Sequence, residues 1–238
     1  MTNLSQHPRI RYNEGCLGAH ALNLIGDRWA LLVVRELMFA PKRFQMIRAG
    51  LPGITASVLT QRLNQLGHAG IVDHNSVLGL YSLTAAGLAL HPVLTELCRW
   101  ALHVPGHDPQ RFISISALMI SISATVNRAR AVNFRLPAGI RCGHESFIVT
   151  FPTQGEPQVR ASRHAQGVFV LEGSGNDLAA AFYGPVPVAD MAVGGRVALH
   201  GDNAAAQEFV DLFSLAAQIS PSSESPEVME HTPGLSST

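Results

Sequence analysis

The stretch GITASVLTQRLNQLGHAG, from Gly53 to Gly70, carries polar side chains of the kinds that recognise bases. Gln and Asn can each form two hydrogen bonds with an adenine edge, and Arg can do the same with guanine. Gln61 and Asn64 are therefore candidates for reading bases. Thr55 and Ser57 lie at the amino end of the stretch, where the dipole and free N–H groups of a helix favour a phosphate oxygen. The chemistry indicated is recognition of DNA.

Basic side chains around this stretch would supply salt-dependent contacts with the DNA backbone. Arg62 lies within it, and Lys42 and Arg43 precede it. The complete set of candidate DNA contacts is Lys42, Arg43, Thr55, Ser57, Thr60, Gln61, Arg62, Asn64 and His74. The alternative is that these polar side chains only solvate an exposed helix. The neighbouring elements favour the DNA interpretation.

The elements that must position these residues follow from the apolar pattern. Ile54, Val58, Leu59, Leu63 and Leu66 recur with the period of an amphipathic helix. Two helices split at position 26 are expected before it. The second runs from 27 to about 39 with a carboxylate cap and is followed by a short helix over 42–50. A hairpin over 71–83 and a helix over 84–103, bent at position 92, should come after it. This order predicts a winged helix-turn-helix.

The second half of the chain predicts a separate domain. The Pro/Gly-rich segment VPGHDP marks a boundary, and 112–126 is interpreted as a helix. Strands are expected over 131–136, 145–151, 157–162, 167–173 and 195–202, with helices over 176–183 and 203–218. The predicted class is α+β. The expected parts are a DNA-binding domain over 1–104, a ligand-binding domain over 108–217 and a disordered tail over 218–238.

Composition limits the functions available to this chain. The 238 residues carry no net charge. Residues 1–104 nevertheless hold nine basic and five acidic side chains, whereas the remainder holds eight basic and twelve acidic ones. A basic amino half suits an approach to phosphate, although so small an excess can also arise by chance. The sequence contains no signal segment or membrane span, which favours a cytoplasmic protein. No cofactor motif or metal site is recognisable.

Several motifs carry a family resemblance in residues 12–102. The segments LIGDRW, LTQRL and YSLTAAG occur in that order after an amino-terminal cysteine. This part resembles the HxlR-type winged-helix transcriptional regulators. The resemblance implies a homodimer that binds pseudo-palindromic, double-stranded promoter DNA. Two residues depart from the family pattern, because Leu17 replaces a proline and His74 replaces a common wing arginine.

The carboxyl half resembles a sterol-carrier-protein-like domain, through GVFVLEGSGNDLAAAFYG and GGRVALHGD. The resemblance implies an apolar tunnel and a hydrophobic small-molecule effector. The residues proposed to line it are Phe134, Phe147, Phe169, Phe182, Tyr183 and Met191. The other interpretation is that these six side chains belong to an ordinary hydrophobic core. A lipid-binding or carrier protein whose winged helix contacts another protein is the alternative function, and an enzyme acting on a lipophilic substrate is a weaker third.

Cysteine and histidine residues raise two further hypotheses. Cys16 is a candidate redox-sensing thiol, with His20 one helical turn away, but the favoured interpretation is a small residue packed at a dimer contact. Cys98 and Cys142 are expected to be structural. His164 and His200 can line a pocket, but the spacing of the eleven histidines predicts no metal site.

Overall fold

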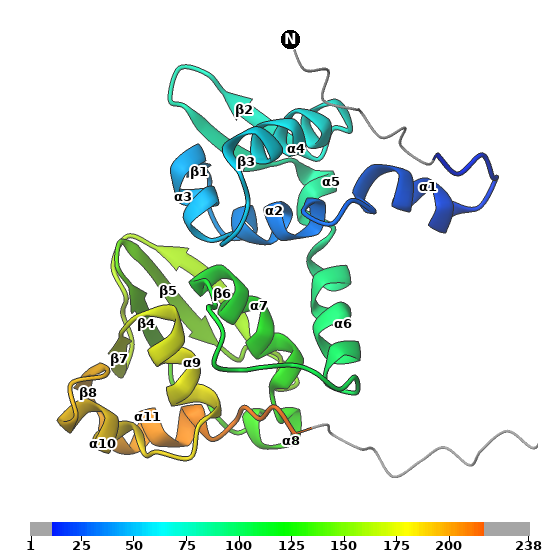
Figure 1. Cartoon of the computed structure of the whole chain (residues 1–238). Helices are drawn as coiled ribbons and strands as arrows, with labels where there is room; N and C mark the ends of the chain where they lie inside the picture. The colour runs from blue at the N-terminus through cyan, green and yellow to red at the C-terminus, as the bar shows by residue number, and fades with distance from the viewer. Residues whose placement is uncertain (1–10, 217–238) are drawn as a thin grey trace, which may run out of the picture.

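The computed structural model describes residues 11–216, and these form two parts, one above the other in Figure 1. The upper part contains four helices, a helical turn and a small sheet. The lower part contains a five-stranded sheet with its helices. Helix α6 (His91–Ala101) descends from the upper part beside the lower one. The predicted tail over 218–238 lies outside the described residues.

The upper part follows the predicted order of elements. Helix α1 (Leu17–Ile25) is followed by α2 (Ala30–Leu37) and the short strand β1 (Lys42–Arg43). Helix α3 (Phe44–Ala49) leads through a turn into α4 (Ala56–His68). The hairpin of β2 (Val72–Asn75) and β3 (Leu80–Leu83) then forms the wing, and β1 pairs with β3. These elements confirm the predicted winged helix-turn-helix.

Two predicted helix boundaries in this part are wrong. Helix α2 starts at Ala30 rather than at Asp27, whose carboxylate accepts a hydrogen bond from the Trp29 N–H group. The single helix predicted over 84–103 is divided into the short α5 (Ala85–Leu88) and α6. Thr84 caps α5 as expected, but Pro92 lies in the first turn of α6, where a missing N–H group costs nothing.

The lower part is built on a sheet with strand order β6-β5-β4-β7-β8. Strand β4 (Ala138–Cys142) runs parallel to β7 (Phe169–Glu172), and the other neighbours are antiparallel. The remaining strands are β5 (Glu145–Thr150), β6 (Gln158–Ser162) and β8 (Ala198–Gly201). The strand predicted over 131–136 is wrong, because α8 (Arg128–Ala131) and a turn occupy that region. Strand β4 lies at the centre of the sheet, and no strand was predicted over its residues.

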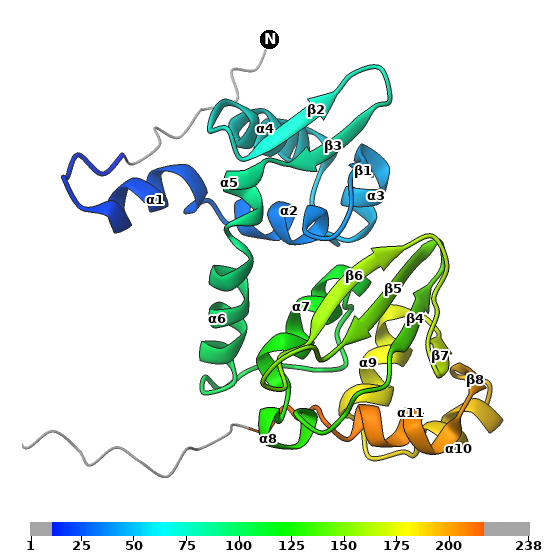
Figure 2. The ribbon, with the colours of Figure 1, turned by 180° about the vertical axis from the view of Figure 1, so that it is seen from behind.

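Helices α7 (Ile115–Thr125), α9 (Gly175–Tyr183) and α11 (Asn203–Val210) share one apolar core with the sheet. Figure 2 shows the strands in front of α7 and α9. A further helix, α10 (Val188–Val193), was not predicted. The helix predicted over 112–126 is confirmed, but it starts after a Ser114 cap and is buried almost all round. Such burial erases the one-sided apolar stripe expected of a surface helix.

Helix α7 also joins the two parts. Leu118, Met119 and Ile122 belong to the core of the lower part, whereas Ile120 packs into the core of the upper part. Phe39, which follows α2, contacts Phe147 on β5 edge to face, with ring centroids 5.7 Å apart. The junction between the two parts is therefore packed like a domain interior rather than hinged on a free linker.

Candidate DNA-binding surface and pockets

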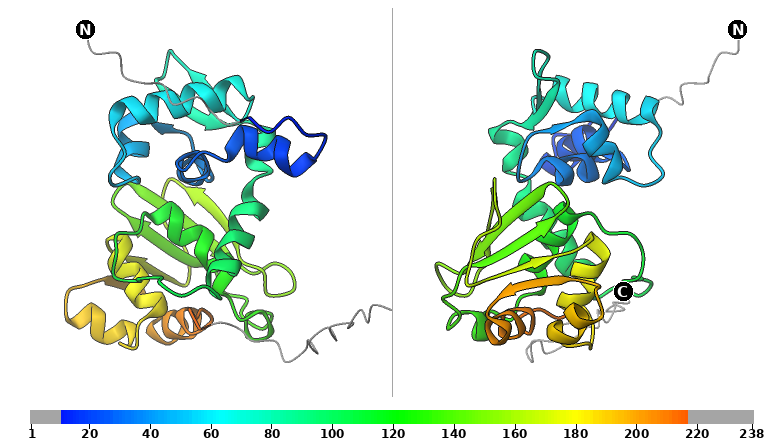
Figure 3. Two further views of the ribbon diagram at one scale, coloured as in Figure 1. Left: turned by 45° about the vertical axis from the view of Figure 1, so that its right-hand side comes forward. Right: turned by 90° about the vertical axis from the view of Figure 1, so that its left-hand side faces the viewer.

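Helix α4 and the wing lie at the end of the molecule that faces away from the lower part (Figures 1 and 3). One side of α4 is anchored by Leu59, Leu63 and Leu66, which are almost fully buried. Thr55 caps the helix, because its hydroxyl accepts a hydrogen bond from the Val58 N–H group at 3.3 Å. The opposite side of α4 is exposed and is not covered by the second domain.

The exposed side carries five of the candidate DNA contacts, namely Thr55, Ser57, Thr60, Gln61 and Asn64. The Thr60 hydroxyl donates to the Ala56 carbonyl, so its proton is already used. Within residues 11–216, the side-chain amides of Gln61 and Asn64 make no hydrogen bond. Both donor and acceptor groups of these amides are therefore available to a partner in solvent.

Arg62 occupies a different position from the one predicted. Its side chain is buried, with an Nη2 atom 2.6 Å from the Asp27 carboxylate and a further hydrogen bond to Gln65. This ion pair ties α4 to the start of α2 behind the exposed face. A backbone contact with DNA requires an accessible guanidinium, so we withdraw Arg62 from the candidate DNA contacts and assign it to the support of α4.

Lys42 needs the same correction. Only 2% of this residue is exposed, and its Nζ atom lies 2.7 Å from Glu145, 3.5 Å from Glu36 and 3.0 Å from the Ser116 hydroxyl. It therefore bridges β1 to the second domain instead of facing solvent. Its neighbour Arg43 is exposed, because successive residues of a strand point to opposite sides.

The wing carries the last candidate, His74. Its ring stacks on that of Tyr81, the residue opposite it in the hairpin, with centroids 4.2 Å apart. Both strands keep this pair near the surface, and Val77 at the tip of the wing is 92% exposed. Because residues 72–83 include no Lys or Arg, the wing has little charge with which to hold a phosphate.

Comparison with known proteins agrees with this architecture. Residues 24–108 match the family model described as HxlR-like helix-turn-helix. The HTH-type transcriptional regulator YvaP of Bacillus subtilis is 36% identical over 86 residues, which cover 34% of this chain and 80% of that protein. The chain belongs to this family of HxlR-like transcriptional regulators.

A further relative, YodB, shows the same partial coverage in its sequence and in its structure. YodB of Bacillus subtilis, another HTH-type transcriptional regulator, is 37% identical over 34% of this chain and 77% of its own length. A crystal structure of quinone-bound YodB aligns with 38% identity over 37% of this chain and 99% of that one, with a TM-score of 0.35. The family match covers the winged-helix part, and the sterol-carrier-like resemblance of residues 108–217 stays a prediction.

An apolar groove runs beside the HxlR-like domain. It has a volume of about 810 Å³ and is lined by α1, α2, α6 and α7. Large apolar side chains that line it are exposed, including Leu22 on α1 and Leu97 on α6, and Trp100 is also exposed on α6. Helix α1 projects from the body in Figures 1 and 2, and Ala19 is its only buried residue. Exposed apolar surface of this kind marks an interaction site.

Cys16 lies exposed at the amino end of α1. The backbone N–H groups of Ala19 and Gly18 hydrogen-bond to its sulfur and hold the pKa of the thiol below its ordinary value. Within the described residues, the Cys16 side chain makes no hydrogen bond with that of His20. Burial instead raises the pKa values of Cys98 and Cys142. Cys16 thus has an exposed thiol with a lowered pKa, whereas the other two thiols are partly buried with raised pKa values, and selective reactivity requires such a difference.

The six residues predicted to line an apolar tunnel are mostly packed against one another or their neighbours. Phe134, Phe147, Phe169, Phe182 and Met191 are each at most 3% exposed. The rings of Phe134, Phe169 and Phe182 surround that of Phe209, with centroids 5.5 to 5.7 Å away. We therefore assign these five residues to the core. Tyr183, the sixth residue, lines a pocket that is also bounded by Arg35 and Leu215.

His164 and His200 do line one pocket, as predicted, together with His144, Arg141 and Arg163. It lies where the segment after β6 crosses the sheet. Among residues 11–216, no group of three or more His, Cys, Asp or Glu side chains is placed to hold a metal ion. The same residues contain no helix long and apolar enough to cross a membrane.

Sequence reasoning missed a polar cluster at the junction of the two domains. Glu36 is 1% exposed, and its carboxylate pairs with Arg35 and Lys42 and accepts a hydrogen bond from the Ser114 hydroxyl at 2.6 Å. One signal was present, because the Arg35–Glu36 pair interrupts the otherwise apolar helix ALLVVREL. Charged residues in such a helix need partners from another element.

Proposed function

We propose that the protein is a DNA-binding transcriptional regulator that acts as a homodimer on pseudo-palindromic promoter DNA. One observation carries the proposal: Gln61 and Asn64 are exposed on α4, and this helix lies at the end of the molecule away from the second domain. Amides in this position suit adenine edges in the major groove. Arg43, Thr55 and Ser57 are proposed as backbone contacts, and His74 as a weak contact of the wing.

The groove between α1 and α6 supports the homodimer. A dimeric regulator places two recognition helices about 34 Å apart, one turn of DNA, so its dimer contact must lie beside the helix-turn-helix. The exposed Leu22 and Leu97 line this groove, and Trp100 is exposed on the same helix as Leu97. Association of two copies through these side chains would bury apolar surface that a monomer leaves in water.

Selection of fragments from the genome of the source organism by the purified protein would provide the operator. The affinities for this operator and for random duplex are then compared across a range of salt concentrations. We expect the operator to bind at least about 10³-fold more tightly, the lower end for specific recognition. Gln61→Ala should reduce this ratio, whereas Gln158→Ala, at an exposed site on β6, should not. Equal binding of operator and random DNA would refute the proposal.

The lipid-carrier alternative has less support, because the predicted tunnel residues form a packed core. Modulation of the regulator by a small molecule remains part of our proposal. A site for this molecule must lie where the described residues leave space.

A further inference from the structure

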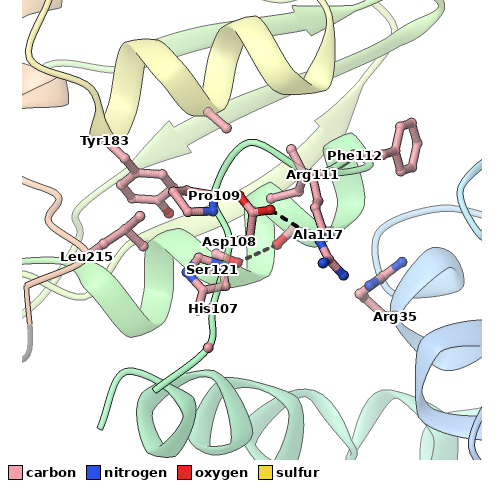
Figure 4. Close-up of a pocket in the computed structure, with 13 residues that line it drawn as sticks. Arg35, His107, Asp108, Pro109, Arg111, Phe112, Ala117, Ser121, Tyr183 and Leu215 are labelled. Atoms are coloured by element: carbon pink, nitrogen blue, oxygen red, sulfur yellow. Dashed lines mark hydrogen bonds and ion pairs between the residues drawn. The ribbon is translucent and has the colours of Figure 1, made fainter. Parts of the chain in front are cut away.

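A hollow of about 430 Å³ lies at the junction of the two domains. We call it the junction pocket. It is bounded by Arg35 of α2, by the linker segment 106–113, by α7 and α9, and by Leu215 (Figure 4). Its volume is within the range of small-molecule sites, roughly 300 to 1,000 Å³. Both domains contribute walls, so any occupant contacts the DNA-binding part and the second domain together.

Small side chains create the space. Ala117 and Ser121 lie one turn apart on α7, and Ala179 faces them from α9. The Ser121 hydroxyl is already bonded to the Ala117 carbonyl at 2.9 Å. Well-packed interiors leave few voids, and larger residues at these three positions would close this one. The floor is therefore largely apolar.

The two ends of the junction pocket differ in chemistry. Tyr183, Pro109 and Leu215 lie at one end in Figure 4, and Arg111 and Arg35 lie towards the other. The Tyr183 hydroxyl lies 3.2 Å from that of Thr125, which anchors the ring at the edge of the pocket. The pocket is thus apolar at one end, and at the other it carries two guanidinium groups, each paired with one carboxylate.

Both guanidinium groups keep unused hydrogen-bond donors. Arg35 bonds Glu36 and the Gly50 carbonyl through Nε and Nη2, and Arg111 bonds Asp108 through Nε. Within residues 11–216, Nη1 of Arg35 and both Nη atoms of Arg111 have no partner. The other titratable groups in the lining are His107, Asp108 and Tyr183. Several unused N–H donors on two guanidinium groups can bind both oxygens of a carboxylate.

We propose that the junction pocket binds a small amphipathic carboxylate, with its charged end at Arg35 and Arg111 and its apolar end against Tyr183 and Leu215. Aromatic carboxylates of two fused rings have the required combination of one anionic end and a flat apolar body. Apolar contact would supply most of the affinity, and the two guanidinium groups would select an anion over a neutral analogue.

Arg35 connects the junction pocket to the helix-turn-helix. Its Nη2 atom donates to the carbonyl of Gly50 at 3.1 Å, and Gly50 ends α3 immediately before the turn into α4. It also pairs with Glu36, which contacts Lys42 on β1. A carboxylate that binds Nη1 of Arg35 thus contacts the same guanidinium group whose Nη2 atom holds this turn. It would shift DNA affinity by binding one arrangement of the turn better than the other. This regulatory step rests on the proposed function.

Calorimetry with 2-naphthoate tests the site, with neutral 2-naphthamide as the matched ligand. We expect one naphthoate per chain and at least about tenfold weaker binding of the amide, as the loss of a charge-assisted hydrogen bond implies. Arg111→Gln should weaken naphthoate similarly, and because Arg111 is 83% exposed the variant should fold. Ala179→Met should abolish binding by filling the floor, whereas Ala189→Met, on the exposed side of α10, should not.

Failure of naphthoate to bind, or equal binding by the Ala179→Met and wild-type proteins, would overturn the site. The regulatory step is tested by measuring operator affinity with and without naphthoate. It is refuted if naphthoate leaves the operator affinity of the wild type unchanged, or if it changes that of Arg111→Gln by the same amount. Loss of operator recognition in the ligand-free protein would instead refute the proposed DNA-binding function. Calorimetry does not depend on DNA, so the two failures are distinguishable.

Discussion

The Nζ atom of Lys42 lies 2.7 Å from the carboxylate of Glu145, and this ion pair joins strand β1 of the winged helix to strand β5 of the second domain. Glu36, Ser114 and Ser116 complete the cluster around it. The cluster sits beside the contact of Phe39 with Phe147. Polar and apolar contacts together fix the orientation of the second domain relative to the start of α3.

Replacement of Lys42 should therefore destabilise the protein strongly. Lys42→Met leaves Glu36 buried without its lysine partner, and we expect a loss of about 3–5 kcal/mol in the free energy of unfolding, as for other broken buried pairs. Urea denaturation followed by circular dichroism measures this loss. Arg43→Met at the exposed neighbouring position is the control and should stay within about 0.5 kcal/mol of wild type. Equal effects would contradict the assigned cluster.

Arg62 and Gln61 are adjacent in sequence and should respond in opposite ways. Arg62→Ala removes the buried partner of Asp27 and should lower the unfolding midpoint. Gln61→Ala should leave that midpoint unchanged and cost about 1–3 kcal/mol of discrimination at one base pair of the operator. Thermal unfolding and operator titrations measure the two quantities. A stable Arg62→Ala protein with unchanged melting would restore Arg62 as a surface residue.

The exposed basic residue Arg43 provides a test of backbone binding. Arg43→Ala should weaken operator and random DNA about equally and reduce the slope of log affinity against log salt by about one. Arg160→Ala, at an exposed site on β6, is the matched control and should leave the slope unchanged. A loss confined to the operator would indicate instead that Arg43 reads a base.

The groove beside α1 and α6 predicts the oligomeric state. Trp100→Glu places a charge on a side chain that is 64% exposed in one chain and that we place in the dimer contact. We expect light scattering to report a dimer for the wild type and a monomer for this variant. Val193→Glu, on a more exposed apolar residue of α10, should remain dimeric. A dimer that survives Trp100→Glu must use another surface.

Cys16 should be the most reactive of the three thiols. Backbone hydrogen bonds lower the pKa of Cys16, so more thiolate is present at neutral pH, whereas burial raises the pKa values of Cys98 and Cys142. Alkylation by iodoacetamide, followed by peptide mass spectrometry over a pH series, should label Cys16 first and at lower pH. Cys16→Ser should remove the fast phase. Uniform labelling of all three thiols would exclude a selective sensor.

Several elements could be predicted because their causes are local. The apolar repeat of α4 and the caps at Thr55 and Thr84 depend on residues within one or two helical turns. The wing follows from two short β-prone runs around a turn. These features were sufficient to place the winged helix and the exposed amides of Gln61 and Asn64.

Other features depend on partners that are distant in the sequence. Lys42 is buried because Glu145 and Ser116 reach it from the second domain, and Arg62 because Asp27 lies behind α4. No local pattern distinguishes such a buried charge from an exposed one. The aromatic residues likewise indicated an apolar interior, but only their packing around Phe209 separates a filled core from a cavity.

The order of elements in the winged helix and the polar face of its recognition helix follow from the sequence alone, since hydrophobic period and capping act over short distances. Which charges reach solvent and where space remains depend on the folded chain. Both depend on the packing of the two domains around α7, which brings together residues more than seventy positions apart, such as Lys42 and Ser116.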